Sequence, residues 1–515
     1  MKERFKYILS VIAIAMLLVC CSDGDEKEVI KPNPNPNPNP NPPVELTDNE
    51  YTNYWIYERM SKLYYWNDKL PASPIYQQEP KDFFESILYN YKQVTGDRFS
   101  WIEADKSKKA KNLFANENLG FDCIPASYFE DMNSRSTKVG FFVITVKRGS
   151  DAEAKGLKRG NVIYAVNGTD VDYNNYTTIL NKSSLNLSVY NSSGVQATLN
   201  TIYANYVPGS PVYKSDLVDI SGTKVGYVKY DAFERGTDDA GTNFDYDIEL
   251  INSIKNLYNQ GATELVLDLR NNPGGYAITA LDLASALVPN RNTSSVFAKY
   301  KYNSYFQDSI VKRWGANSLN DYFIDKVYGT SVDIPSSNLS RLFVIANEYS
   351  ASASEMVING LRPYFKDQLV FIGETTVGKD QASITVQTSD SRIKWQLQPI
   401  VAKLKNAEDQ GDYTAGLQPD VTMYEWAEGY TMRRETANSG ALVDFPTLSP
   451  WKGGFKDFGD PEEPLFGEAI ARITGQLPKS AKLGDVGKNV STLEFRKDNY
   501  KTIIDEDRFE RLEKK

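Results

Sequence analysis

Residues 342–356 read LFVIANEYSASASEM, and this stretch decides the fold class. Its first five residues are apolar and predict a short buried strand, and the residues that follow recur at helical spacing. The helical positions are Ala353, Met356, Val357, Gly360, Leu361 and Tyr364. A serine-rich turn at 350–354 therefore lies between a strand and a helix N-terminus. Unpaired N–H groups and the helix dipole at such a place favour a developing oxyanion.

The same turn has a purely structural interpretation. Ser352 and Glu355 fit an S-x-x-E capping box, which starts a helix without any chemistry. A serine nucleophile needs a base, and the chain contains no histidine. Lys379 follows the next apolar segment, 369–372, and is the candidate base. Its pKa must fall from ~10.4 to ~7–8, which burial can supply. An exposed Lys379 would be only part of a solvated turn.

A third stretch, residues 267–275, reads LDLRNNPGG. It predicts a buried strand that runs directly into a Gly-Gly turn. Glycines allow backbone N–H groups to approach a reacting oxygen closely. A tight turn after a core strand is the simpler alternative, and it requires no function.

The surrounding pattern predicts an α/β core within a multidomain α/β (α+β) protein. Apolar strands are expected at 225–230, 265–269 and 342–346, with an amphipathic helix at 247–258 between the first two. Another helix is expected at 465–473, closed by Gly475. Upstream, two helical faces predict a small helical domain, the first segment ending at Pro71 and the second running from Phe83 to Tyr91. The last ~40 residues are polar and predict a loosely attached tail.

Residues 149–163, GSDAEAKGLKRGNVI, and the following Val166-Asn167-Gly168 resemble the glycine-rich stretch of a PDZ domain, over residues 113–206. PDZ domains bind the C-terminus of a peptide as an added strand. The resemblance places the carboxylate-binding loop at Leu119, Gly120 and Phe121. A small β-domain with a glycine-rich turn is the alternative.

Several motifs in register resemble the carboxy-terminal processing, or tail-specific, serine peptidases. They span residues 113–422: the PDZ stretch, Gly226-Tyr227-Val228, LDLRNNPGG at 267–275, SASASE at 350–355, GETTVGK at 373–379 and GLQPD at 416–420. The resemblance implies proteolysis of substrates docked by their C-termini, through an acyl-enzyme, without a metal or cofactor.

Site residues follow from the same resemblance. Ser352 corresponds to the nucleophile and Lys379 to the general base. The backbone N–H groups of Ala353, Gly274 and Gly275 correspond to the oxyanion hole.

Supporting polar residues are implied at Glu355 and Thr376. The family often has a glutamine four residues after the lysine, where this chain has Ser383, while Gln381 lies two residues after it. Which of these two orients Lys379 is left open by the sequence.

Composition excludes other classes of function. The 515 residues carry a net charge of −9, which gives no electrostatic reason for nucleic-acid binding. Three cysteines are too few for a disulfide framework or a Cys-rich metal site. The S-x-x-K of penicillin-binding enzymes occurs only without its companion motif, and a P-loop is absent. An acidic group at 238–247 is better explained as a solvated loop than as a calcium site.

The chain start predicts a bacterial lipoprotein. A basic segment precedes about 13 apolar residues at 7–19, too few to span a bilayer. A lipobox-like sequence follows, with Cys21 as the first lipidation candidate and Cys20 as the second. Acidic residues and the extended KPNPNPNPNPNPP spacer at 31–43 come next. We expect a lipid-anchored protein of the cell envelope, at the outer membrane, on its periplasmic or surface face.

The expected organisation is a series of six segments. They are a lipoprotein signal peptide (1–21), an acidic and Pro-Asn linker (22–45), a helical N-terminal domain (46–112), the PDZ domain (113–206), the peptidase core (207–450) and a C-terminal helix with a polar tail (451–515). The alternative function is an inactive surface lipoprotein that only binds peptide tails. The oligomeric state is left open.

Overall fold

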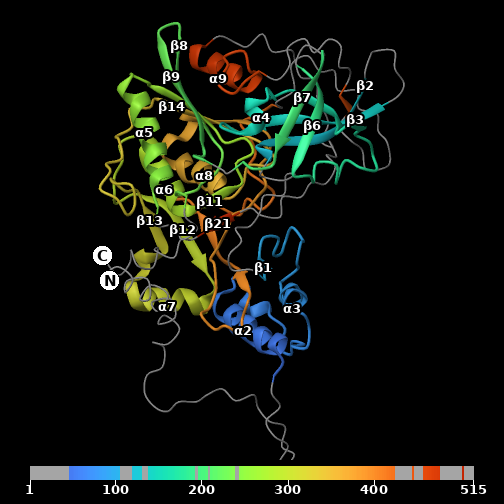
Figure 1. The fold of residues 1–515 in the computed structure, drawn as a ribbon. Helices are drawn as coiled ribbons and strands as arrows, with labels where there is room; N and C mark the ends of the chain where they lie inside the picture. The colour runs from blue at the N-terminus through green and yellow to red at the C-terminus, as the bar shows by residue number, and fades with distance from the viewer. Residues whose placement is uncertain are drawn as a thin grey trace, which may run out of the picture.

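The computed structural model of the chain places several sheets and the helices that cover them (Figure 1). It describes residues 46–104, 119–129, 137–191, 195–206, 209–237, 243–423, 444–445, 456–475 and 501–503. The predicted signal peptide, with Cys20 and Cys21, lies outside these ranges. Within them, no helix has the length and apolarity that crossing a bilayer requires.

The central sheet follows the predicted α/β pattern. Its strand order is β19-β15-β14-β10-β9-β8. The strands are β8 (Val212–Ile220), β9 (Thr223–Tyr230), β10 (Glu264–Asp268), β14 (Arg341–Ala346), β15 (Leu369–Gly373) and β19 (Val421–Thr422). All neighbours pair in parallel except β8 and β9. The carboxyl ends of β9, β10, β14 and β15 therefore lie on one edge, where ligands bind in open α/β sheets.

Helices cover both faces of this sheet. On one face lie α5 (Asp245–Asn259), α6 (Ala277–Leu287) and α8 (Ala353–Phe365), and on the other lies α9 (Pro464–Thr474). Strand β10 alternates accordingly, because Leu265 and Leu267 pack with the first group and Val266 packs with α9. The strand is buried on both sides, which explains its continuous apolar sequence.

A second sheet contains a strand from the predicted polar tail. Its order is β11-β21-β16-β18-β12-β13. The strands are β11 (Gly274–Tyr276), β21 (Lys501–Ile503), β16 (Gln381–Ser383), β18 (Ile400–Lys405), β12 (Val296–Tyr302) and β13 (Asn320–Tyr322). The expectation of a loosely attached tail is therefore wrong for residues 501–503, which lie between two strands of the core.

A β-domain with its own apolar core lies beside the central sheet (Figure 1). Its strand order is β20-β2-β3-β4-β6-β7, with β5 paired to β4. The strands are β2 (Phe121–Phe129), β3 (Thr137–Val146), β4 (Val162–Val166), β5 (Thr169–Asp170), β6 (Ser184–Tyr190), β7 (Gln196–Tyr203) and β20 (Asp444–Phe445). The assignment of this region as a PDZ domain, and the other domain boundaries, stay predictions.

The N-terminal region contains α2 (Asp48–Leu63), α3 (Pro80–Ser86) and β1 (Trp101–Glu103). The first helix ends before the predicted Pro71, because Tyr64 is already extended at φ −62° and ψ 133°. The second ends at Ser86 rather than near Tyr91. Strand β1 pairs antiparallel with β17 (Gln396–Gln398), so this region is joined to the core.

Candidate active site

Ser352 lies in the turn between β14 and α8, as the sequence predicts. Its side chain has no exposed surface. Its backbone is left-handed, with φ 63° and ψ −110°, a conformation that costs a non-glycine residue about 1–3 kcal/mol. The surrounding contacts must therefore hold it in place. A residue that only capped a helix would have no reason for this strained backbone.

The Glu355 carboxylate joins the serine turn to the lysine loop. Its Oε2 accepts hydrogen bonds from the backbone nitrogens of Ser352 (2.6 Å) and Lys379 (2.8 Å). Its Oε1 accepts from Thr376 Oγ1 (2.5 Å) and the Gly378 nitrogen (2.7 Å). Burial raises the pKa of Glu355, and these four hydrogen bonds oppose that rise. Glu355 thus contacts the helix N-terminus, as the capping-box interpretation requires, and also fixes Lys379 beside Ser352.

Lys379 is fully buried, and a lysine that acts as a general base needs such burial to lose its proton near neutral pH. Its Nζ lies 5.2 Å from the centroid of the Phe99 ring. The neighbouring Arg98 donates from one guanidinium nitrogen to the carbonyls of Gly378 and Thr414, each at 2.9 Å. The N-terminal region therefore covers the lysine loop. Sequence reasoning missed this cover, because no local pattern links residues 280 positions apart.

The Gly-Gly turn lies next to the serine turn. The Asn272 carbonyl accepts hydrogen bonds from the Ala351 nitrogen (3.0 Å) and from Ser354 Oγ (3.1 Å), the residues on either side of the Ser352–Ala353 pair. The Gly274 N–H donates to Asn272 Oδ1 at 2.9 Å, so one expected oxyanion donor is engaged inside the turn.

Gly275 is required by close backbone contact. A Cβ atom at this position would lie 2.1 Å from the Phe233 carbonyl oxygen, at a φ of 145° that favours glycine. Ala353, the remaining expected donor, is the first residue of α8 and is fully buried. Gly275 and Ala353 thus flank the serine from the two adjoining turns.

The two candidates for orienting Lys379 differ in their surroundings. Both Gln381 and Ser383 are buried in β16. Ser383 Oγ accepts a hydrogen bond from Gln398 Nε2 at 3.1 Å, and Gln398 Oε1 accepts from Thr385 at 2.9 Å. Gln398 of β17 thus places next to Ser383 a glutamine side chain, which the family often carries on the Ser383 strand itself. Gln381 Oε1 has no hydrogen-bond partner among the described residues.

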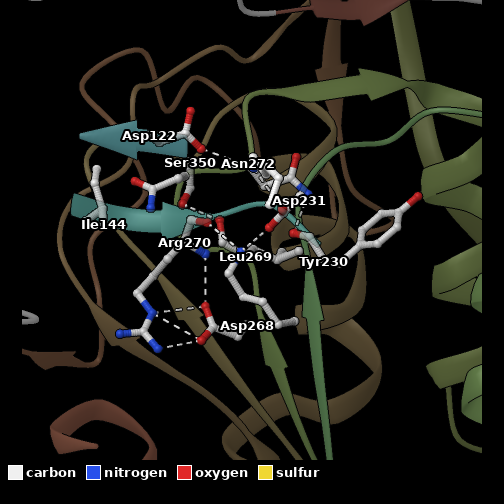
Figure 2. A network of polar contacts seen from close by, with 12 residues as sticks. Asp122, Ile144, Tyr230, Asp231, Asp268, Leu269, Arg270, Asn272 and Ser350 are labelled. Atoms are coloured by element: carbon white, nitrogen blue, oxygen red, sulfur yellow. Dashed lines mark hydrogen bonds and ion pairs between the residues drawn. The ribbon is translucent and has the colours of Figure 1, made fainter. Parts of the chain in front are cut away.

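A partly buried ion cluster lies at the same sheet edge and links it to the β-domain (Figure 2). Lys147 pairs with Asp122 (3.1 Å) and Asp231 (3.0 Å), and Lys229 pairs with Asp231 (2.7 Å). Arg270 pairs with Asp268 (2.5 Å) and, through a different nitrogen, with Glu463 (2.7 Å). We call these seven residues the ion cluster.

Two carboxylates of the ion cluster, Asp268 and Asp231, are held in the charged form by neighbouring cations. Burial alone would raise the pKa of Asp268, but the Arg270 guanidinium outweighs burial and holds that pKa below its ordinary value. The same competition, with Lys147 and Lys229 as the cations, holds the pKa of Asp231 far below its ordinary value. This is the electrostatics of a structural junction rather than of a proton acceptor.

The predicted carboxylate loop, Leu119 to Phe121, leads into β2, of which Phe121 is the first residue. Leu119 and Phe121 are buried in the core of the β-domain, and Gly120 has a φ of 75°. The Gly120 carbonyl accepts a hydrogen bond from the nitrogen of Lys147, a residue of the ion cluster. Within the part of the chain that the structure describes, no group of three potential metal ligands is found.

Comparisons with known proteins agree with this architecture. Residues 224–423 match the model of Peptidase family S41, and residues 51–101 match the Peptidase S41 N-terminal domain. The chain is 27% identical over 296 residues to the carboxyl-terminal-processing protease of a Picosynechococcus strain, covering 56% of this chain and 62% of that protein. It is 25% identical over 304 residues to the chloroplastic carboxyl-terminal-processing peptidase 3 of Arabidopsis thaliana, covering 56% and 52%. The chain thus spans about half to three-fifths of the length of these curated relatives.

A solved structure gives a wider match. A protein of Bacteroides fragilis described as an S41 protease superposes with a TM-score of 0.63 at 25% identity, covering 82% of this chain and 97% of that one. The two family matches and the site between β11, α8 and β16 agree with one another. Residues 224–423 are similar to peptidase family S41, a family of serine peptidases, and residues 51–101 are similar to that family's N-terminal domain.

Proposed function

We propose that this protein is a serine endopeptidase that cleaves protein substrates recognised by their C-termini, with Ser352 as nucleophile and Lys379 as general base. The observation that carries the proposal is the shared Glu355 oxygen, which accepts hydrogen bonds from the backbone of both residues. It holds the backbones of a buried serine and a buried lysine close together at one point of the sheet edge. In a chain without histidine, the base of a serine nucleophile must be a lysine, a carboxylate or a terminal amine, and Lys379 is a buried lysine at this point.

The reaction follows from the placement of these groups. Burial favours the neutral amine of Lys379, which accepts the proton of Ser352 Oγ as the oxygen attacks the substrate carbonyl. The N–H groups of Gly275 and Ala353 stabilise the oxyanion, with Gly274 supporting the turn. The bond to the leaving amine then breaks, the amine takes up a proton, and water hydrolyses the acyl-enzyme.

Substrate docking is assigned to the β-domain. Its loop Leu119-Gly120-Phe121 leads into β2, whose outer edge pairs with β20 only at Ser127 and Tyr128 among the described residues. The earlier half of that edge can therefore accept a peptide as an added strand. The relatives named as carboxyl-terminal-processing enzymes support the same substrate class. We further propose that Cys21 carries a lipid anchor to the outer membrane.

The decisive experiment compares the wild type with Ser352→Ala on an unfolded protein substrate with an apolar C-terminus. The protein should begin at Ser22, so that lipidation does not interfere. We expect kcat/KM to fall by about 10³-fold or more in the variant. Equal cleavage by both proteins would remove Ser352 from the mechanism.

A binding measurement distinguishes the proposed peptidase from the alternative, an inactive receptor for peptide tails. Fluorescence anisotropy should follow the same C-terminal peptide bound to Ser352→Ala. Binding without any cleavage by the wild type would leave a peptide receptor rather than an enzyme.

A further inference from the structure

Strand β21 comes from the far end of the chain and lies between two strands of the candidate active site (Figure 1). It pairs in parallel with β11, in the register Gly274 to Lys501, Gly275 to Thr502 and Tyr276 to Ile503. On its other side it pairs in parallel with β16, where Ser383 faces Ile503. Residues 501–503 are therefore the only described element between β11 and β16 in that sheet.

Both neighbours of β21 belong to the reaction site. Strand β11 starts with the Gly-Gly turn, and β16 begins two residues after Lys379. A peptidase must hold its substrate extended beside the nucleophile and the oxyanion donors, and pairing with an exposed strand edge is the general way to do so. The position of β21 satisfies this requirement.

We propose that the space between β11 and β16 is the binding cleft for an extended substrate chain, and that the C-terminal tail occupies it as an intramolecular competitor. This inference rests on the peptidase function proposed above. It assigns β11 and β16 as the two strands that bind the substrate backbone, and it gives the tail a regulatory role.

The cleft requires an occupant. Strand β16 pairs with β18 on one side, so without β21 its other side would be an unpaired strand edge among the described residues. The tail sequence suits this place, because Thr502, Ile503 and Ile504 are β-branched residues in an otherwise polar segment.

The pairing of the tail is short enough to be displaced. Strand β21 has three residues, and its contact with β16 consists of a single register pair. A typical strand has about 5–6 residues. Covalent attachment compensates for this weakness, because a segment of the same chain has an effective concentration on the order of millimolar. A substrate must therefore compete with the tail, and its apparent KM rises.

The test is Thr502→Pro in the full chain, since proline removes the N–H group and disfavours strand pairing at the centre of β21. The matched control is Glu513→Pro, the same substitution in the tail but outside the strand. We expect the KM for the unfolded substrate to fall at least threefold in Thr502→Pro, with kcat unchanged, and to stay at the wild-type value in Glu513→Pro. An unchanged or higher KM in Thr502→Pro would overturn the inference.

A second measurement uses binding instead of catalysis. A fluorescent synthetic peptide with the sequence of residues 496–508 should bind more tightly to the Ser352→Ala, Thr502→Pro double variant than to Ser352→Ala alone. Thermal unfolding of both proteins checks that they are folded. Tighter binding in the absence of any proteolysis would uphold the cleft while the peptidase proposal fails. Proteolysis together with equal peptide binding would overturn the cleft assignment and leave the peptidase proposal intact.

Intact mass spectrometry separates an inhibitor from a substrate. We expect the tail of the wild type to remain whole during the assay. Loss of the tail in the wild type but not in Ser352→Ala would make the tail a substrate of the enzyme and would overturn its role as a competitor.

Discussion

Two buried lysines at one edge of the central sheet lie in different surroundings. Lys229, in the ion cluster, contacts the Asp231 carboxylate at 2.7 Å and the Arg270 carbonyl at 2.9 Å. Lys379 lies against the Phe99 ring, and the nearby Glu355 carboxylate accepts hydrogen bonds from backbone nitrogens, including that of Lys379 itself. The first lysine is an ion-pair partner of a carboxylate, whereas burial under an aromatic ring is compatible with a neutral amine.

This difference suits Lys229 to a structural role and Lys379 to a role in the reaction. Replacing a paired buried charge leaves its partner uncompensated and destabilises the fold. Replacing a buried base removes proton transfer but leaves an apolar surrounding that an apolar side chain also fits. The same substitution at the two lysines should therefore have opposite consequences for stability and for activity.

The largest expected effect comes from Lys379→Met and Lys229→Met. We expect Lys379→Met to lower kcat/KM by about 10³-fold, the contribution of a positioned base, with little change in the unfolding midpoint. Lys229→Met should destabilise the protein by about 3–5 kcal/mol, while its folded molecules keep near-normal kcat. Steady-state kinetics and chemical denaturation on both variants measure the two effects. Equal losses of activity in both variants would break the comparison.

A smaller effect is expected for Glu355→Gln. An amide offers one acceptor oxygen, so either the Ser352–Lys379 pair or the Thr376–Gly378 pair of donors loses its acceptor. Because this misplaces both reacting residues, we expect kcat to fall about 10- to 100-fold.

Glu463→Gln is the control for Glu355→Gln, since Glu463 accepts from Arg270 in the ion cluster. It should lower the unfolding midpoint and leave kcat near that of the wild type. A kcat for Glu355→Gln within threefold of the wild type would show that the shared carboxylate does not position the site.

Substitution of Phe99 should shift the pH profile. In the proposed mechanism the neutral Lys379 amine is the active form, so activity should rise with pH through the lysine pKa. Phe99→Ala admits water and favours the charged form. We therefore expect the rising limb of the kcat/KM profile to move up by about one pH unit, so that kcat/KM falls about tenfold at pH values below the limb.

Phe99→Leu sharpens this test. Leucine keeps the apolar cover but removes the ring face that attracts a cation, so the limb should not move upward. An upward shift of equal size in both variants would show that the ring acts through cation–π attraction or loop packing rather than by excluding water.

The sequence predicts the elements whose residues are close in the chain. Strand β10, strand β14 and helix α8 follow from apolar runs and helical spacing, and the serine turn follows from their junction. The cover over Lys379 did not follow, because Phe99 and Arg98 reach the site through long-range contacts such as the pairing of β1 with β17. Their local sequence is that of an ordinary turn, and long-range packing leaves no periodic signal.

The tail strand shows the same limit. Residues 501–503 lie in a polar segment without periodicity, and their strand conformation depends on the edges of β11 and β16. Ser383 is another case. Its contact with Gln398 depends on two strands meeting, so the departure from the family pattern could be seen in sequence but this contact could not.

The smallest effect is expected in the pH dependence of stability, where the two regions should have opposite signs. Lys147 and Lys229 outweigh burial and lower the pKa of Asp231, so its contribution is present above its unfolded value of 3.8 and is lost as pH falls through the folded pKa. Burial raises the pKa of Glu355, so its contribution is present below its unfolded value of 4.5 and is lost as pH rises through the folded pKa.

Unfolding midpoints of the wild type, Asp231→Asn and Glu355→Gln between pH 3 and pH 8 test these signs. The unfolding midpoint of the wild type should exceed that of Asp231→Asn by a growing margin as the pH rises from 3, because the ion cluster needs a charged carboxylate. The difference in unfolding midpoint between the wild type and Glu355→Gln should shrink as the pH rises above the unfolded pKa of Glu355. Each kcal/mol of lost stability should lower this difference by about 2–4 °C. Parallel trends for the two variants would mean that Glu355, like Asp231, is held charged by its neighbours, and that the site and the ion cluster share one kind of electrostatics.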